Sequence, residues 1–404
     1  MIKLKGVPEP SLLILLLLVS FPSVGAVLFT PSLPIIAEYF QISSGMAQLT
    51  VTLFLIGYAL GQLPYGPLSN KIGRKPTLYI GLLLSIVGAL LCAIAGPLHQ
   101  FWLLLVSRLI AALGASVGLM MTFTIVSDYY EPALARQKLA FVIVAFAIAP
   151  GAAVTLGGLF TQLLSWESAF YLQTAYSVLM LLLCFRLPET STELSSEPFS
   201  LKLIYESYTK RCKNPKLFLC GLIQGCCTSF VYIFAAKAPF LAIHLLGLTP
   251  ASYGALNLIP AVGMILGAVL SHRTAHFMTP QKGILFGLLV MFPSTIAMLA
   301  AFALGAFNLW TLFVPYFFAN MGIVFAYINC PTIGTGHAKN KPNASAVLAF
   351  LNISMCVLTV FILEIFDSQA PVLMPVLFIA LFALLFPLYG LLEAQIKKEH
   401  TLNR

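Results

Sequence analysis

Charged side chains are scarce in this sequence. Only 9% of the 404 residues are Asp, Glu, Lys or Arg, whereas 60% are hydrophobic. An ordinary soluble domain carries roughly a quarter charged residues, so most of this chain must lie in lipid. Because each membrane-spanning helix needs roughly 20 mainly apolar residues, a chain of this length with short loops can form about a dozen spans. The composition therefore predicts an all-α, polytopic membrane protein.

The residue clusters of a metal centre or of a membrane-embedded enzyme are also lacking. The eight cysteines show no metal-ligand spacing, and the six histidines are dispersed along the chain. His272 and His276 stand four residues apart but have no third ligand nearby. A repeated filter motif of the kind that channels use is absent as well. We therefore expect no metal, no other cofactor and no enzyme activity, with a membrane-embedded enzyme as the alternative from another class.

Lys and Arg are missing from every second predicted loop. All of the 22 basic residues except Arg108 and Lys237 fall in the remaining loops, in the tails or at their flanks. The positive-inside rule places those loops and both termini in the cytoplasm of a bacterial inner membrane. This topology accounts for the net charge of +9 without a nucleic-acid partner. The predicted spans are 11–36, 47–68, 77–95, 101–127, 137–160, 168–186, 216–245, 251–271, 283–304, 310–333, 343–366 and 371–393.

The longest hydrophilic stretch, Pro188 to Lys216, divides the predicted spans into two sets of six. We expect an N-terminal six-helix bundle over 1–190, a cytoplasmic linker over 191–215 and a C-terminal bundle with a short cytoplasmic tail over 216–404. The segment 68–71 after the second span has a faint counterpart at 270–273 after the eighth span. Parallel six-helix repeats, as found in many transporters, would produce such a pair.

The loop from Gly66 to Pro76 resembles the signature that the major facilitator superfamily carries between its second and third helices. The resemblance implies a twelve-helix fold of two six-helix bundles and transport of a small molecule by alternating access. Glycines permit a tight turn there, and the basic residues hold the loop at the cytoplasmic surface. The gating residues implied by this motif are Gly66, Asn70, Gly73, Arg74 and Lys75.

Other segments are similar to the Bcr/CflA drug-efflux branch of that superfamily: Pro31-Ser32-Leu33-Pro34, Arg108, Leu156-Gly157-Gly158, Ala238-Pro239-Phe240 and Asn343-Ala344-Ser345-Ala346. The chain also departs from the branch. Asn70 stands where the family loop usually has Asp, and the segment 26–29 lacks the acid that the branch carries in its first helix. Ala111 and Val154 replace a Gln and a Pro that are usual there. These departures argue against a proton-coupled drug antiporter of the ordinary design.

Arg108 and Lys237 are basic residues inside predicted spans, each roughly 10–12 Å below the outer surface at about 1.5 Å per residue. Ionisable residues inside a membrane are costly, so each is a functional candidate. The family resemblance would bring both to one central cavity. No acid lies near the middle of a span, so we hypothesise an anionic substrate, such as a carboxylate-rich metabolite or a citrate-type siderophore. Two alternatives stay open: Arg108 packs against backbone carbonyls or Gln side chains, and Lys237 extends to the outer interface.

Further polar residues on cavity-facing helices could complete a substrate site: Gln62, Gln224, Tyr232, Asn320, Tyr327 and Asn329. Candidates for proton coupling are Asp128, His244 and Glu364, all near helix ends, and facilitated exchange without protons stays open as the alternative. A proton-coupled multidrug efflux antiporter of Bcr/CflA type is the second transporter hypothesis. The expected surroundings are the lipid bilayer, a small-molecule substrate and a monomeric state. Neither the substrate nor the direction of transport follows from the sequence.

Overall fold

The computed structural model describes residues 8–191, 194, 209, 213–336, 341–366 and 370–402. Within these residues every regular element is a helix, and none is a strand. In this part of the chain 10 helices are long and apolar enough to cross a membrane, and the shorter apolar helices Ile148–Leu163 and Ser168–Cys184 overlap two further predicted spans. The predicted all-α membrane class is therefore confirmed, and the helices are consistent with twelve spans.

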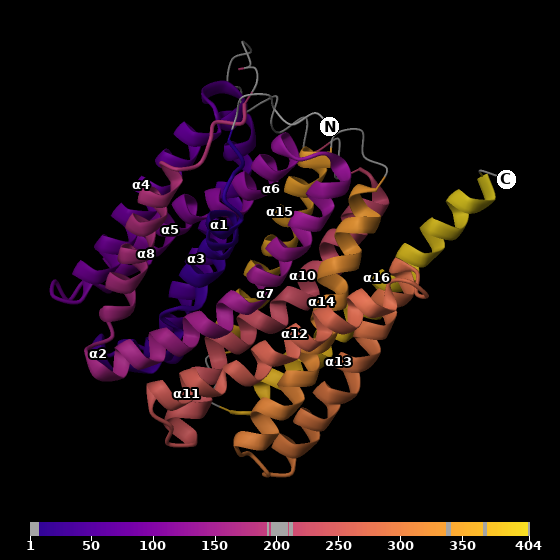
Figure 1. Cartoon of the computed structure of the whole chain (residues 1–404). Coiled ribbons are helices and arrows are strands. Elements are labelled where there is room, and N and C mark those ends of the chain that lie inside the picture. The colour runs from indigo at the N-terminus through magenta and orange to yellow at the C-terminus, as the bar shows by residue number, and fades with distance from the viewer. Residues whose placement is uncertain are drawn as a thin grey trace.

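The helices fall into two sequential groups that Figure 1 shows in indigo to magenta and in rose through orange to yellow. The first group is α1 (Leu12–Val27), η1 (Thr30–Ser32), α2 (Leu33–Tyr39), α3 (Ser44–Ile72), α4 (Arg74–Ala95), α5 (Phe101–Ala115), α6 (Val117–Tyr129), α7 (Pro132–Leu163) and α8 (Ser168–Cys184). The second group is α10 (Pro215–Phe240), η2 (Leu241–Leu245), α11 (Pro250–Leu256), α12 (Leu258–Thr274), α13 (Pro280–Ala303), α14 (Leu309–Thr335), α15 (Lys341–Ile365) and α16 (Leu373–Leu402).

The first predicted span is broken near its outer end. Helix α1 ends at Val27, and η1 and α2 continue the span in a new direction. Pro31 has no N–H group, so it cannot pair with the carbonyl of Val27, and the hydroxyl of Thr30 donates to that carbonyl instead at 2.9 Å. The break leaves the last carbonyls of α1 available to other donors.

The two groups pack against each other through α3 with α15 and through α7 with α11 and α12. Glycines allow this approach: a Cβ atom on Gly158 of α7 would lie 2.2 Å from the carbonyl oxygen of Pro250 in α11. A Cβ atom on Gly157 would lie 1.6 Å from the carbonyl oxygen of Leu28, in the broken first span. These two glycines of α7 therefore serve close contact between helices.

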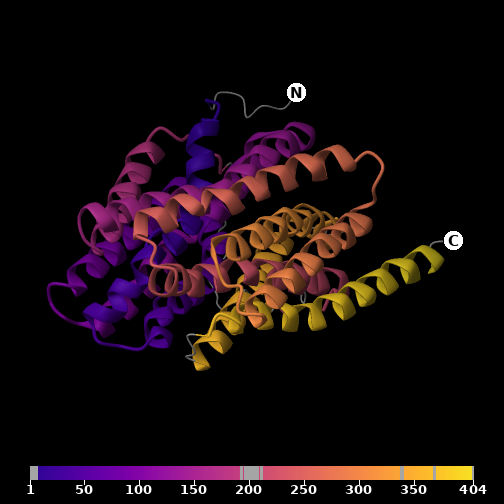
Figure 2. The same cartoon turned by 90° about the horizontal axis from the view of Figure 1, so that it is seen from below.

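Large apolar side chains cover the outside of the bundle, as lipid contact requires. Leu83 of α4, Val106 of α5 and Leu289 of α13 are all more than half exposed, at 51%, 53% and 55%. Figures 1 and 2 show that the end of α16 projects away from the other helices. In Figure 1 the start of α1 and the end of α16 lie towards the upper end, opposite α2 and α11. The topology predicted from the positive charges makes that upper end cytoplasmic.

Candidate functional site

A small cavity of about 40 Å³ lies where the two helix groups meet. It is lined by Val27 of α1, by Pro150, Gly151 and Val154 of α7, by Val231, Phe234 and Ala235 of α10, by Tyr253 of α11, by Asn257, by Pro260, Ala261 and Met264 of α12, and by Tyr316 and Asn320 of α14. None of these lining residues is charged. Such a mainly apolar hollow with a few polar groups is typical of small-molecule sites.

One wall of the cavity is aromatic. The rings of Phe234 and Tyr316 are stacked, with centroids 3.6 Å apart and an interplanar angle of 5°. The amide groups at the cavity are held by their own helices, since Asn320 Nδ2 donates to the Tyr316 carbonyl at 2.9 Å and Asn257 Nδ2 donates to the Tyr253 carbonyl at 2.8 Å. The wall therefore offers a flat surface on which a ring could stack, with amide groups beside it.

Arg108 does not line this cavity. Its side chain is fully buried, and its guanidinium donates to four acceptors on neighbouring helices. Nε donates to the Thr50 carbonyl at 3.1 Å, Nη1 to the Gly25 carbonyl at 3.0 Å and to Gln173 Oε1 at 3.4 Å, and Nη2 to the Ala26 carbonyl at 3.4 Å. Gly25 and Ala26 belong to the last turn of α1, where carbonyls lack helical partners. Arg108 thus caps the break in the first span with a positive charge.

Aromatic rings enclose the same guanidinium. Arg108 Cζ lies 4.1 Å from the ring centroid of Phe29 and 4.2 Å from that of Phe54. Contacts of a cation with an aromatic face stabilise it in a desolvated site. The arrangement matches the packing alternative for Arg108 more closely than the anion-binding hypothesis, because its partners come from the protein itself.

Lys237 is also buried, with 1% of its surface exposed, and it lies on α10 near Pro239. It stands about one helical turn beyond Phe234 towards the predicted outer end, and it does not line the cavity. The structure therefore does not bring Arg108 and Lys237 together around this cavity.

The other predicted substrate residues divide into two sets. Asn320 lines the cavity, as expected for a substrate contact. The remaining five lie elsewhere: Gln62, Tyr232 and Tyr327 are buried between helices, Gln224 is half-buried, and Asn329 donates to the Phe325 carbonyl at 2.8 Å. The sequence did not single out Phe234, Tyr253, Asn257 or Tyr316, because only tertiary packing distinguishes them from the many other aromatic and amide residues.

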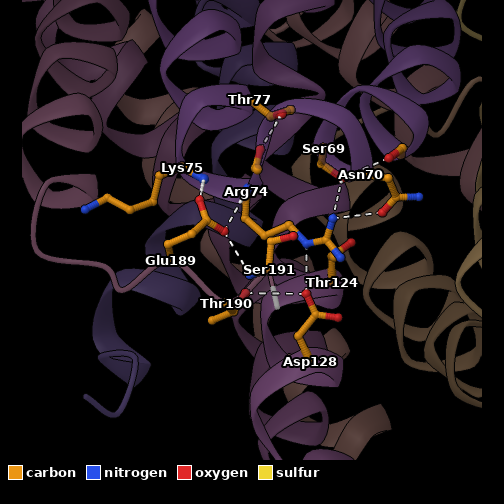
Figure 3. Close-up of polar contacts among 12 residues, drawn as sticks. Ser69, Asn70, Arg74, Lys75, Thr77, Thr124, Asp128, Glu189, Thr190 and Ser191 are labelled. Atoms are coloured by element: carbon orange, nitrogen blue, oxygen red, sulfur yellow. Dashed lines mark hydrogen bonds and ion pairs between the residues drawn. The ribbon is translucent and has the colours of Figure 1, made fainter. Parts of the chain in front are cut away.

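The predicted gating residues form a polar network at the upper end of the bundle, which Figure 3 shows. Arg74 Nε forms an ion pair with Asp128 Oδ2 at 2.8 Å, and Arg74 Nη1 donates to Asn70 Oδ1 at 2.8 Å and to Ser69 Oγ at 3.3 Å. Asn70 therefore supplies an acceptor to Arg74 even though it lacks a charge. Asp128, a proton-coupling candidate, is the ion-pair partner of Arg74 in this state.

Glu189, which follows α8, completes the network and was not anticipated from the sequence. Its carboxylate accepts from the backbone N–H groups of Arg74 at 3.0 Å and Lys75 at 2.9 Å, at the start of α4, and from Ser191 N at 2.9 Å. Gly73 has φ of 97°, which favours glycine, and a Cβ atom there would lie 2.8 Å from Glu189 Oε2. The signal in the sequence was an acid directly after the sixth predicted span.

Gly66, also in the predicted gating motif, makes no close packing contact, since a Cβ atom there would meet only Met120 Cε at 3.9 Å.

Replacing Glu189 with alanine is expected to lower the free energy of unfolding by about 1 kcal/mol, because the first N–H groups of α4 lose a charged acceptor. Thermal unfolding of the purified protein in detergent measures the change. Glu393→Ala is the control, since Glu393 is an acid that forms an ion pair with Lys397 one turn along α16 at 3.1 Å. Its effect is expected to stay within about 0.5 kcal/mol. Equal effects of the two substitutions would contradict the capping role.

Two further contacts join the helix groups, one between η2 and α2 and one between α15 and α3. His244 Nε2 of η2 lies 3.4 Å from Glu38 Oε1 of α2, beside a hollow of about 320 Å³. Thr52 of α3 donates to Glu364 Oε1 of α15, and the Glu364 side chain is buried, with 8% of the residue exposed. His244 and Glu364, both proton-coupling candidates, therefore lie at junctions between the groups.

Comparison with known proteins gives matches over most of the chain. A family model described as Major Facilitator Superfamily matches residues 13–362. An uncharacterized transporter of Rickettsia felis is 27% identical over 262 residues, which are 65% of this chain and 63% of that protein. The chain thus spans less than two thirds of that relative. Multidrug resistance protein D of Escherichia coli is 24% identical over 328 residues, 78% of each chain, and multidrug transporter MdfA of Shigella boydii is 26% identical over 282 residues, 68% of each.

Solved structures share the fold at low identity. A crystal structure of a D-xylose-proton symporter has a TM-score of 0.74 at 13% identity and covers 92% of this chain and 95% of that chain. A bacterial homolog of the human lysosomal transporter Spinster, in an inward-facing and unoccupied conformation, has a TM-score of 0.69 at 16% identity and covers 96% of this chain and 97% of that chain. At these identities the likeness concerns the fold alone.

Proposed function

The chain belongs to the major facilitator superfamily, and from that membership we propose that it exports apolar or weakly polar organic compounds through the cavity between its helix groups. One observation carries this proposal: the lining of the cavity between the helix groups is aromatic, aliphatic and amide, without a charged side chain. Desolvating an anion in such a site would be costly, whereas ring stacking and apolar burial are favourable. Export is favoured because relatives carry names that refer to multidrug resistance and multidrug transport.

We further propose that Glu364 couples transport to protons. The usual acid of the first helix is absent, and Asp128 is already paired with Arg74 at 2.8 Å. Glu364 lies at the contact of α3 with α15, where relative movement of the two groups would change its access to water. A buried carboxyl that gains and loses a proton there would meet the requirement for alternating access. His244 is more exposed than Glu364, so it is a weaker candidate.

A drug-susceptibility assay tests the proposed cargo. The chain is expressed in a bacterial host that lacks its own drug pumps, and growth is measured with lipophilic neutral and cationic compounds, ethidium among them. We expect expression to raise the tolerated concentration of at least one compound about fourfold or more. Val231→Trp, which places a large ring in the cavity, is expected to remove that tolerance.

Val269→Trp is the matched control for the cavity. It makes the same change at a position on α12 that is 46% exposed, where lipid can accommodate the ring. Both variants must be present in membranes at wild-type amounts. If Val231→Trp retains the full tolerance, the cavity does not carry the cargo.

The second candidate is an anionic substrate, and the observation that favours it is the buried cation of Lys237 about one turn beyond the cavity wall. An anionic substrate predicts one of two results. Expression of the chain would support growth under iron limitation with a citrate-type siderophore, or it would allow uptake of a carboxylate-rich metabolite. Lys237→Met would then abolish that uptake while leaving the amount of protein in the membrane unchanged.

We also propose a bacterial inner-membrane location with both termini in the cytoplasm, and two bundles over 1–190 and 216–404 joined by a linker over 191–215. The distribution of Lys and Arg supports the orientation. Most of the proposed linker lies outside the described residues. The monomeric state stays a prediction.

A further inference from the structure

The polar side chains in the described lining of the cavity all come from the second helix group. The first group contributes only residues without a polar side-chain atom: Val27, Pro150, Gly151 and Val154. The second group contributes two tyrosines and two asparagines: Tyr253, Asn257, Tyr316 and Asn320. Because these four residues belong to one group, movement between the groups can change the apolar wall opposite them without separating them from one another.

Tyr253 has a hydroxyl that the protein does not satisfy. Its side chain is fully buried, and its Oη atom has no hydrogen-bond partner among the described residues. The ring belongs to the aromatic wall, since its centroid lies 6.3 Å from that of Phe313, which in turn lies 5.9 Å from that of Phe234. A buried hydroxyl without a partner destabilises the folded state, so its place beside a cavity requires an explanation. A ligand that bonds to it would supply one.

The two asparagines of the lining are held in the same way. Each follows a cavity tyrosine by four residues, and its Nδ2 donates to the carbonyl of that tyrosine, at 2.8 Å for Asn257 and 2.9 Å for Asn320. This bond fixes the amide and leaves Oδ1 as the acceptor of each side chain. The second helix group therefore presents two amide oxygens and one phenolic hydroxyl to the same cavity.

The first helix group closes over these polar groups in this state. Thr155 Oγ1 of α7 donates to the carbonyl of Gly254, next to Tyr253, at 2.8 Å. A Cβ atom on Gly151 would lie 2.5 Å from Cβ of Ala261. The volume of about 40 Å³ is close to that of one water molecule, which occupies about 30 Å³ in the liquid. Room for cargo therefore requires that the first group moves away.

We propose that Tyr253, Asn257 and Asn320 recognise a carboxamide group attached to an aromatic ring. The inference rests on the proposed export through this cavity and names the class of compound. The two N–H bonds of a primary carboxamide would donate to Oδ1 of Asn257 and of Asn320, and its carbonyl would accept from Tyr253 Oη. The ring would pack against the stacked pair of Phe234 and Tyr316. We call the three recognising residues the carboxamide site.

The carboxamide site discriminates against charged groups. An ammonium group offers donors only, so the proton of the Tyr253 hydroxyl would still lack an acceptor, and none of the lining residues is an acid. A carboxylate offers acceptors only, and it would face the two amide oxygens. A carboxamide is neutral and planar and offers donors and an acceptor together.

Equilibrium dialysis of the full-length protein in lipid nanodiscs, with empty nanodiscs as the blank, tests the site. The two probes are naphthalene-2-carboxamide and 2-acetylnaphthalene, which differ only by a methyl group in place of the amide nitrogen. We expect the wild type to bind the carboxamide about tenfold or more tightly than the ketone, which corresponds to about 1.4 kcal/mol. Asn320→Ala should reduce this preference to about threefold or less.

Asn329→Ala is the matched control for Asn320→Ala. Asn329 lies on the same helix and its Nδ2 also donates to the carbonyl four residues earlier, at 2.8 Å, but it does not line the cavity. It is expected to keep the preference for the carboxamide. Equal loss of preference in the two variants would show an effect of helix packing and would overturn the carboxamide site.

Tyr253→Phe is expected to weaken binding of both probes about fivefold or more, because both carry the carbonyl that accepts from Oη. It should also raise the unfolding temperature by about 1–3 °C, because it removes a buried hydroxyl without a partner. A hydroxyl with a structural role would lower that temperature. Tyr58→Phe is the control, since Tyr58 Oη is likewise buried without a partner among the described residues but does not line the cavity. It should keep the binding of both probes.

The results separate the carboxamide site from the proposed export. A wild type that raises drug tolerance but binds the two probes equally, or binds neither, would overturn the site and not the export. Wild-type binding of both probes by Tyr253→Phe would overturn the site as well. A chain that raises tolerance to no compound and binds neither probe would overturn both proposals.

Discussion

Arg108→Ala is expected to destabilise the folded protein itself, by about 3–5 kcal/mol, in addition to abolishing transport. The guanidinium donates hydrogen bonds to the carbonyls of Thr50, Gly25 and Ala26, and truncation leaves these buried acceptors without their donor. Each such acceptor costs about 1–3 kcal/mol. Arg108→Lys should recover only part of the loss, because an ammonium group cannot reproduce the planar fork. Thermal unfolding in detergent and the amount of protein in membranes measure both effects.

Arg273→Ala provides the control for Arg108, because Arg273 is an exposed arginine in the last turn of α12. Its effect is expected to stay within about 0.5 kcal/mol. The anion-binding hypothesis makes a different forecast for Arg108→Ala. If Arg108 served only to bind a substrate, Arg108→Ala would unfold at the wild-type temperature and would lose only the uptake of an anionic compound. That result would refute the capping role.

Much of the fold could be predicted because its signals are local. Apolar runs and the distribution of Lys and Arg identify spans one at a time, and the loop from Gly66 to Pro76 identifies the family from contiguous residues. The division of the first span was harder. Pro31 and Pro34 were visible, but the length of apolar sequence predicted one continuous span over 11–36, whereas α1 ends at Val27.

The site could be predicted only in part because its contacts join distant segments. A buried arginine was evident from the sequence, but its partners in the last turn of α1 depend on how α5 packs beside that break. The cavity is lined by residues of six helices and by the stacked rings of Phe234 and Tyr316, two of many aromatic residues. The role of Glu189 could not be predicted for the same reason, because it caps a helix more than a hundred residues earlier in the chain.

Glu364→Gln is expected to remove the dependence of transport on a pH gradient while the protein still exchanges cargo across the membrane. Glutamine has nearly the same shape and keeps an oxygen that accepts from Thr52, so the contact of α3 with α15 survives. It cannot release a proton. In proteoliposomes, gradient-driven transport of a compound identified by the susceptibility assay should fall at least tenfold, which corresponds to about 1.4 kcal/mol in the transition-state barrier. Counterflow at equal pH on both sides should stay within about twofold of the wild-type rate.

Two matched substitutions separate Glu364 from the other candidates. His244→Gln removes the titratable partner of Glu38 at the outer contact, and Asp128→Asn removes the charge that pairs with Arg74. If protons act at Glu364, His244→Gln keeps the response to the gradient. Asp128→Asn is expected to lower gradient-driven transport and counterflow together, because it weakens the gating network and not the proton site. A gradient response that persists in Glu364→Gln and disappears in His244→Gln would move proton coupling to the outer contact. The carboxyl at the α3–α15 contact would then serve only to hold the helix groups together.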